Sequence, residues 1–111
     1  MVLWKCTSCN MVIEATEPPN ECPKCGAPRE RLVELSGDQE KLVLKSRRTN
    51  YLHIEAVSLL RKLLEVAEEG IRENLDPGCV KIFEEERTFA KTMIQKILAE
   101  IEGHVKKGKW G

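Results

Sequence analysis

Two pairs of cysteines near the start of the sequence are the residues best suited to chemistry. Cys6 and Cys9 form the first pair and Cys22 and Cys25 the second, with two residues between the cysteines of each pair. Each Cys-x-x-Cys loop aims two sulfurs at one point, so two facing loops can surround one ion with four thiolates. Soft thiolate ligands in tetrahedral geometry select zinc or iron. The spacing therefore predicts a metal site in which these four cysteines are the ligands.

The residue after each pair carries further information about the loops. Gly26 follows the second pair and Asn10 follows the first. After each pair the backbone must turn back so that amide groups point at sulfur, which favours a positive φ. Glycine adopts a positive φ freely, and asparagine tolerates it better than most residues. We therefore predict that Asn10 has a left-handed conformation equivalent to that of Gly26.

Composition and charge exclude several classes of function. The chain has 111 residues, with 18 basic and 18 acidic side chains and no net charge, so it lacks the basic footprint of a nucleic-acid-binding protein. No apolar run approaches the ~20 residues that span a bilayer, and the first residues do not resemble a signal peptide. We expect a cytoplasmic protein, without a membrane or nucleic-acid partner, in which clustered cysteines stay reduced and bind metal.

The sequence divides into a small cysteine-rich part and a helical part, which predicts an α+β fold. Residues 1–36 form the expected metal module, with short strands at Leu3–Lys5 and Met11–Glu14. A module of this size cannot bury a self-sufficient core, and chains this small usually need a metal or disulfides to fold. The turn signal Ser36-Gly37-Asp38 opens a predicted linker over residues 37–49.

A helical hairpin with a basic C-terminal tail is predicted for residues 50–111. The first helix should begin near Asn50, with Thr49 or Asn50 as its N-cap, and stop near Leu75. Asp76 fits the N-cap of a second helix that ends at about Gly103 or His104, because Pro77 suits the first helical position. The apolar side chains that define the first helix recur every three or four residues: Leu52, Ala56, Leu59, Leu60, Leu63, Ala67 and Ile71.

The apolar face of this hairpin is too wide for two helices to cover. It can pack against the cysteine module, or two hairpins can pair into a four-helix bundle. We favour the second explanation and expect a homodimer through the helices.

The cysteine-rich part resembles a known family. Residues 2–35 contain Trp4-Lys5-Cys6-x-x-Cys9, Val12, Glu14, Pro19, Cys22-Pro23-x-Cys25, Pro28 and Leu32-Val33. This arrangement resembles the rubredoxin-like domain of rubrerythrins, although Asn10 stands where the family usually has glycine. The resemblance implies one iron per chain, bound by Cys6, Cys9, Cys22 and Cys25, that exchanges single electrons with a redox partner protein.

The helical part does not extend this resemblance. Rubrerythrins also have a four-helix di-iron domain with Glu-x-x-His pairs, but here Asn50 precedes His53 by three residues and Ile101 precedes His104. We therefore expect no peroxidase chemistry and no enzyme activity of the chain alone. The acidic residues of the helices are predicted to lie on the solvent-exposed surface and not to form a carboxylate site: Glu55, Glu84, Glu85 and Glu86.

The alternative function is that of a zinc-ribbon adaptor. Zinc would then be a structural ion and the helical hairpin would be the surface that binds another protein. The remaining candidates are assigned structural roles. Trp4 is expected to shield the metal, His53 to lie at the surface or in the hairpin, and Cys79 to be a packed or half-exposed residue. Trp110 belongs to the basic tail.

Overall fold

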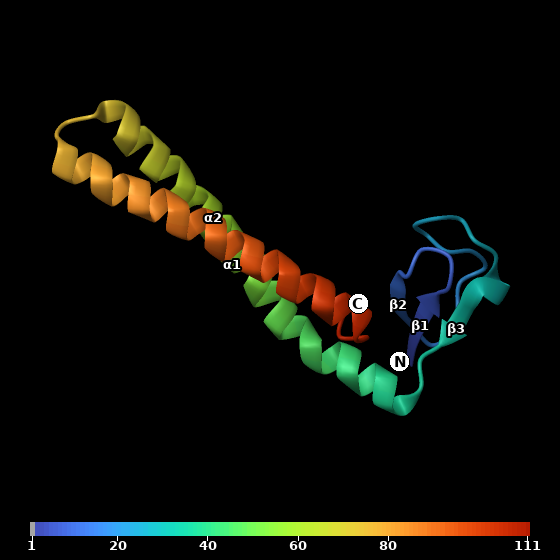
Figure 1. Ribbon diagram of the computed structural model, residues 1–111. Coiled ribbons are helices and arrows are strands. Elements are labelled where there is room, and N and C mark those ends of the chain that lie inside the picture. Colours follow the sequence, from blue (N-terminus) through green and yellow to red (C-terminus); the bar gives the residue numbers. More distant parts are fainter. Residues whose placement is uncertain (1) are drawn as a thin grey trace. The chain divides into compact units, whose positions relative to one another are not determined.

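The computed structural model describes residues 2–111, which form two compact units. One unit takes in the residues up to Arg47 together with Lys107–Gly111, and the other is Arg48–Lys106. A three-stranded sheet and two long helices confirm the predicted α+β class (Figure 1). No helix of the described residues is long and apolar enough to cross a membrane.

The sheet consists of β1 (Val2–Cys6), β2 (Val12–Ala15) and β3 (Leu32–Glu34). Both outer strands pair antiparallel with β1, in the order β2-β1-β3. The two predicted strands are present with slightly shifted ends, and the hydrophobic stretch at residues 32–33 adds the third. The buried residues at the centre of this unit are Cys6, Cys22 and Leu32, so two of the predicted ligands belong to its core.

Helix α1 spans Gly37–Glu73, and the predicted linker over residues 37–49 is therefore wrong. The Ser36 hydroxyl accepts from the Gln39 amide at 3.4 Å, and Gln39 Oε1 accepts from the Ser36 amide at 3.2 Å. This reciprocal capping box starts the helix well before Asn50. Neither Thr49 nor Asn50 is an N-cap, because both lie inside α1.

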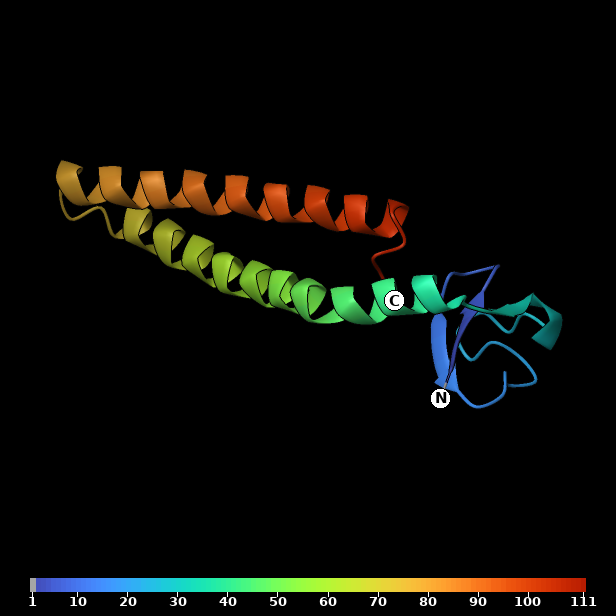
Figure 2. The same ribbon diagram turned by 90° about the horizontal axis from the view of Figure 1, so that it is seen from below.

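The C-terminal tail folds onto the first unit instead of extending the hairpin, which corrects the predicted extent of the hairpin domain. Arg47 Nε donates to the Gly111 carbonyl at 2.8 Å and Arg47 Nη1 lies 3.6 Å from Glu14 Oε2. Gly111 packs so closely on Val12 that an added Cβ would lie 2.5 Å from its Cγ2. Figure 2 shows the tail returning to the first turns of α1. The tail thus closes one side of the unit that contains the sheet.

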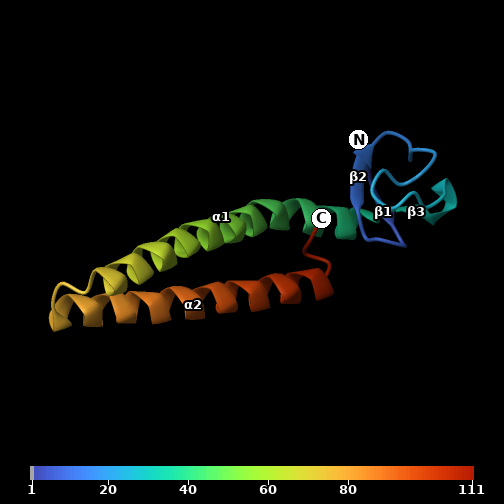
Figure 3. The same ribbon diagram turned by 90° about the horizontal axis from the view of Figure 1, so that it is seen from above.

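The turn between the helices confirms the predicted N-cap. Helix α1 ends at Glu73, and Asn74 has a left-handed φ of 50° that suits a helix C-terminus. Helix α2 spans Pro77–Lys106, and Asp76 Oδ1 accepts from the Cys79 amide at 2.8 Å. This hydrogen bond holds the pKa of the Asp76 carboxyl below its usual value. The short turn makes α1 and α2 an antiparallel pair within residues 48–106 (Figure 3).

Small residues let the two helices approach each other closely. Ala67 of α1 and Ala90 of α2 are fully buried. Gly70 of α1 lies directly against the ring of Phe83 of α2, so that a Cβ on Gly70 would sit 2.4 Å from two ring carbons. The Phe83 ring occupies space that any larger residue at position 70 would need.

Alanine substitutions at two helical glycines test this contact. Gly103→Ala should raise the free energy of unfolding by about 0.5–1 kcal/mol, because glycine is a poor helix residue and nothing lies near the added methyl group. Gly70→Ala should lack this gain, because displacing the Phe83 ring costs about 1–3 kcal/mol. Urea unfolding of the two variants gives the comparison, and equal stabilisation by both would contradict the close contact.

Candidate metal centre

The two cysteine loops have the same backbone structure. In each loop the residue after the second cysteine donates its amide to the carbonyl of the first cysteine, from Asn10 to Cys6 and from Gly26 to Cys22, both at 2.8 Å. The amides of Cys6 and Cys22 in turn donate to the carbonyl five residues later, at 2.9 and 2.8 Å. Asn10 has a φ of 68° and Gly26 a φ of 74°, which confirms the predicted left-handed turn. The asparagine and the glycine therefore serve equivalent turns.

The loops bring four sulfurs to one place. The Sγ atoms of Cys6 and Cys25 are 3.6 Å apart, as are those of Cys9 and Cys22, and all four lie within 4.8 Å of one another. A tetrahedral site with metal–sulfur bonds of about 2.3 Å has sulfur–sulfur edges of roughly 3.8 Å. A disulfide would need about 2.05 Å, and all four cysteines are free. The sulfur positions therefore fit one tetrahedral metal ion.

Backbone amides and neighbouring sulfurs divide negative charge unevenly among the cysteines. The amide of Cys9, together with that of Ser8, lowers the pKa of Cys6 to about 6. The amide of Cys25 similarly lowers the pKa of Cys22. At Cys25 the amide of Ala27 acts in the same direction, but partial desolvation of the sulfur and hydrogen bonds with the other three cysteines outweigh it and raise the pKa to about 12. Four thiolates this close repel one another, and a bound cation removes that penalty.

The site is buried on one side and open on the other. Cys6 and Cys22 are 0% and 1% exposed, Cys9 is half-buried and Cys25 is exposed. Trp4 lies on the same face of β1 as Cys6, because residues two apart in a strand share a face. Its indole Nε1 donates to the Ala15 carbonyl at 3.1 Å, which fixes the ring toward β2. Its role as a shield for the metal stays a prediction.

A cluster of polar side chains joins the two helices, and it was not predicted from the sequence. His104 Nδ1 donates to Asn50 Oδ1 at 2.6 Å, and His104 Nε2 lies 3.3 Å from Glu100 Oε1. The rings of His53 and His104 meet edge-on with centroids 6.1 Å apart. Among residues 2–111, however, only the four cysteines bring three or more metal-binding side chains close enough to share an ion. The hydrogen bond from His104 to the buried Asn50 joins α2 to α1.

Cys79 is tied to the cap of α2. Its Sγ lies 3.5 Å from Asp76 Oδ2, to which it donates, and the hydrogen bond and charge of this carboxylate raise the pKa of the thiol. The helix N-terminus favours a thiolate, but the Asp76 carboxylate opposes it. Cys79 is half-buried, which agrees with the prediction of a packed or half-exposed residue.

Three antiparallel strands and two equivalent cysteine loops together define a small module that is positioned to bind one metal ion. Residues 4–32 match the family model described as "Rubrerythrin, rubredoxin-like domain". The module is therefore rubredoxin-like, as the resemblance implied, while the helical hairpin lies outside the matched segment. Comparison with curated proteins and with solved structures gives no significant match.

Substitutions at Asn10 test the equivalence of the loops. Asn10→Ala should weaken zinc binding about tenfold, because a left-handed conformation costs alanine about 1–2 kcal/mol and folding of the module is coupled to metal binding. Asn10→Gly should leave the affinity unchanged or tighter. Chelator competition measures both. Equal losses for glycine and alanine would show that the Asn10 side chain, not its φ, matters.

Serine substitutions at two cysteines test the ligand set. Cys22→Ser should lower metal affinity by more than the roughly 10–100-fold typical of residues outside the ligand shell, and should unfold residues 1–35 while leaving most of the helical signal. Cys79→Ser is the matched control and should bind metal with unchanged stoichiometry. Metal analysis and circular dichroism provide the readouts. A Cys79→Ser variant with reduced metal content would contradict the four-cysteine assignment.

Proposed function

We propose that this protein is a small electron carrier whose rubredoxin-like module binds one iron through Cys6, Cys9, Cys22 and Cys25. The observation that carries the proposal is the match of residues 4–32 to the rubredoxin-like domain, combined with four sulfurs at tetrahedral spacing. Iron bound by four thiolates changes its charge by a single electron, which is the chemistry that the ion supplies. The exposed Cys25 provides a short route between the site and the surface.

The protein's part is to stabilise charge at the sulfurs. The amides of Cys9 and Ser8 face the Cys6 sulfur, and those of Cys25 and Lys24 face the Cys22 sulfur. Amide hydrogen bonds stabilise the more negative, reduced state of such a site and raise its reduction potential. Because the two loops have the same backbone hydrogen bonds, they supply matching amide donors to Cys6 and Cys22.

The charge of residues 2–35, which hold the four cysteines, favours a basic redox partner, although the other residues of the first unit bring its net charge back to about zero. Residues 2–35 carry four basic and five acidic side chains, and four thiolates with a divalent ion bring the net charge to about −3. An acidic surface steers a positively charged partner, and electron-transfer contacts are small and transient. The charged side chains counted are Lys5, Lys24, Arg29, Arg31, Glu14, Glu17, Glu21, Glu30 and Glu34.

Anaerobic reconstitution with iron tests the function. The loaded protein should be red, because thiolate-to-iron charge transfer absorbs visible light, and the colour should bleach with dithionite and return on reoxidation. The Cys22→Ser variant should stay colourless, whereas Cys79→Ser should match the wild type. A wild-type protein that remains colourless with iron supplied and takes up only zinc would overturn the proposal and favour the zinc-ribbon adaptor.

A further inference from the structure

The inner seam of the hairpin follows a heptad pattern on both helices. On α1 the contact positions alternate in steps of three and four. On α2 they follow the same spacing, except that the charged Arg87 occupies the position between Phe83 and Ala90. Buried residues of this seam include Asn50, Ala67, Ala90 and Ile97. The inner seam comprises Asn50, His53, Val57, Leu60, Leu64, Ala67 and Ile71 of α1 and Val80, Phe83, Ala90, Ile94, Ile97, Ile101 and His104 of α2.

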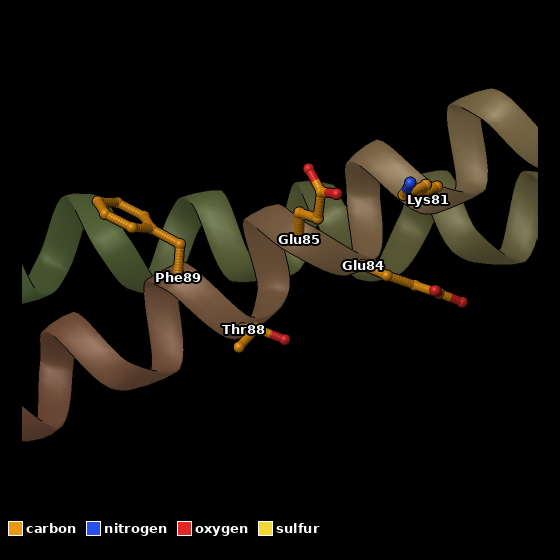
Figure 4. A pocket seen from close by; sticks show the side chains of 5 residues that line it. All are labelled: Lys81, Glu84, Glu85, Thr88 and Phe89. Atoms are coloured by element: carbon orange, nitrogen blue, oxygen red, sulfur yellow. The ribbon is translucent and has the colours of Figure 1, made fainter.

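A second apolar row, here called the outer stripe, runs beside the inner seam. Its α1 members are also spaced by three and four residues, and Leu59 is 65% exposed. On α2 the 54% exposed Phe89 is the central member, and its ring projects from the helix near Glu85 in Figure 4. Glu86 interrupts the row on α2. The outer stripe comprises Leu52, Ala56, Leu59, Leu63 and Val66 of α1 and Ile82, Phe89 and Met93 of α2.

The two halves of the outer stripe lie on the same side of the hairpin. Successive residues of a helix are separated by about 100°, which places the outer stripe roughly 110° around each helix from the inner seam. Two antiparallel helices are related by a two-fold axis perpendicular to the plane that contains them. This rotation carries a residue that lies above the plane on one helix to a position above the plane on the other. The outer stripe occupies equivalent heptad positions on α1 and α2, so both halves face the same way. The contacts of Asn50 with His104 and of Gly70 with Phe83 set the register. In this register the halves meet where Leu63 and Val66 are level with Phe89 and Met93, and the α1 half continues from there to Leu52.

The hairpin cannot cover this face by itself. Two helices make a single contact surface, and a helix with two apolar rows needs a neighbour on each. Of the four buried residues in the unit, two are alanines and one is the polar Asn50. The hairpin unit therefore buries few large apolar side chains, whereas small domains depend on burying most of their apolar surface.

The area and charge of the outer stripe fit a second copy of this chain. Its five large, half-exposed side chains offer on the order of 100 Å² each, so they supply most of the roughly 800 Å² that each partner buries in a standard interface. The rim on α1 alternates in sign along Arg48, Glu55, Lys62 and Glu69. A rim of one sign would repel its own copy, whereas this one can pair with it.

We propose that the outer stripes of two chains pack face to face, forming a symmetric dimer with a four-helix core. A two-fold axis makes the same surface meet itself, so an apolar face automatically finds an apolar partner. Four helices then each have two neighbours, as their two apolar rows require. The dimer does not depend on which metal the cysteines bind, so failure of the redox proposal would leave it untouched.

Sedimentation of the full-length, zinc-loaded protein tests the dimer. The wild type should give twice the 12.7 kDa chain mass at micromolar concentration. Leu59→Glu should raise the dissociation constant by on the order of 100-fold or more, because the symmetric interface buries a carboxylate from each chain. The matched control is Ser58→Glu, which adds the same charge at an exposed neighbouring position outside the outer stripe and should remain dimeric.

The thermal midpoint of the wild type provides a second measurement that needs no variant. Unfolding coupled to dissociation makes the midpoint rise with protein concentration, and the iron-loaded and zinc-loaded forms should behave alike. A wild type that sediments as a monomer, or whose midpoint is independent of concentration, overturns the dimer. Equal weakening by Leu59→Glu and Ser58→Glu would place the interface elsewhere.

Discussion

The convergence of four sulfurs within 4.8 Å is the constraint on which the first unit depends. The unit has few buried apolar residues, and two of its most buried side chains are the cysteines Cys6 and Cys22. The site therefore forms part of the core of this unit. Like charges at such short distances repel unless a cation binds, so the folded arrangement and the bound ion stabilise each other.

Backbone geometry meets this constraint in the same way in both loops. A tight turn after each cysteine pair returns the chain so that amides face the sulfurs, and it requires the positive φ of Asn10 and Gly26. Strand β1 ends at Cys6 and pairs with both other strands, which fixes the first loop against the sheet. Asparagine and glycine therefore occupy the two loop positions at which the backbone needs a positive φ.

Features set by a few neighbouring residues were predictable from the sequence, and those set by distant contacts were not. The cysteine loops, the left-handed Asn10 and the Asp76 cap depend on residues within one turn of each other. Ser36 was predicted to lie in a turn, although Gln39, three residues later, completes a capping box with it. The hydrogen bond from Arg47 to Gly111 joins residues far apart in sequence, and no local pattern predicts it.

Asn50 shows how a distant contact can reverse a local interpretation. Asparagine before an apolar row is typical of an N-cap, yet Asn50 is 3% exposed within α1 and accepts from His104 of α2. A buried polar side chain is costly without a partner. Sliding one helix along the other would preserve most apolar contacts but would separate this pair. The hydrogen bond therefore favours a single register of the hairpin, and in that register the two halves of the outer stripe meet beside Val66 and Phe89.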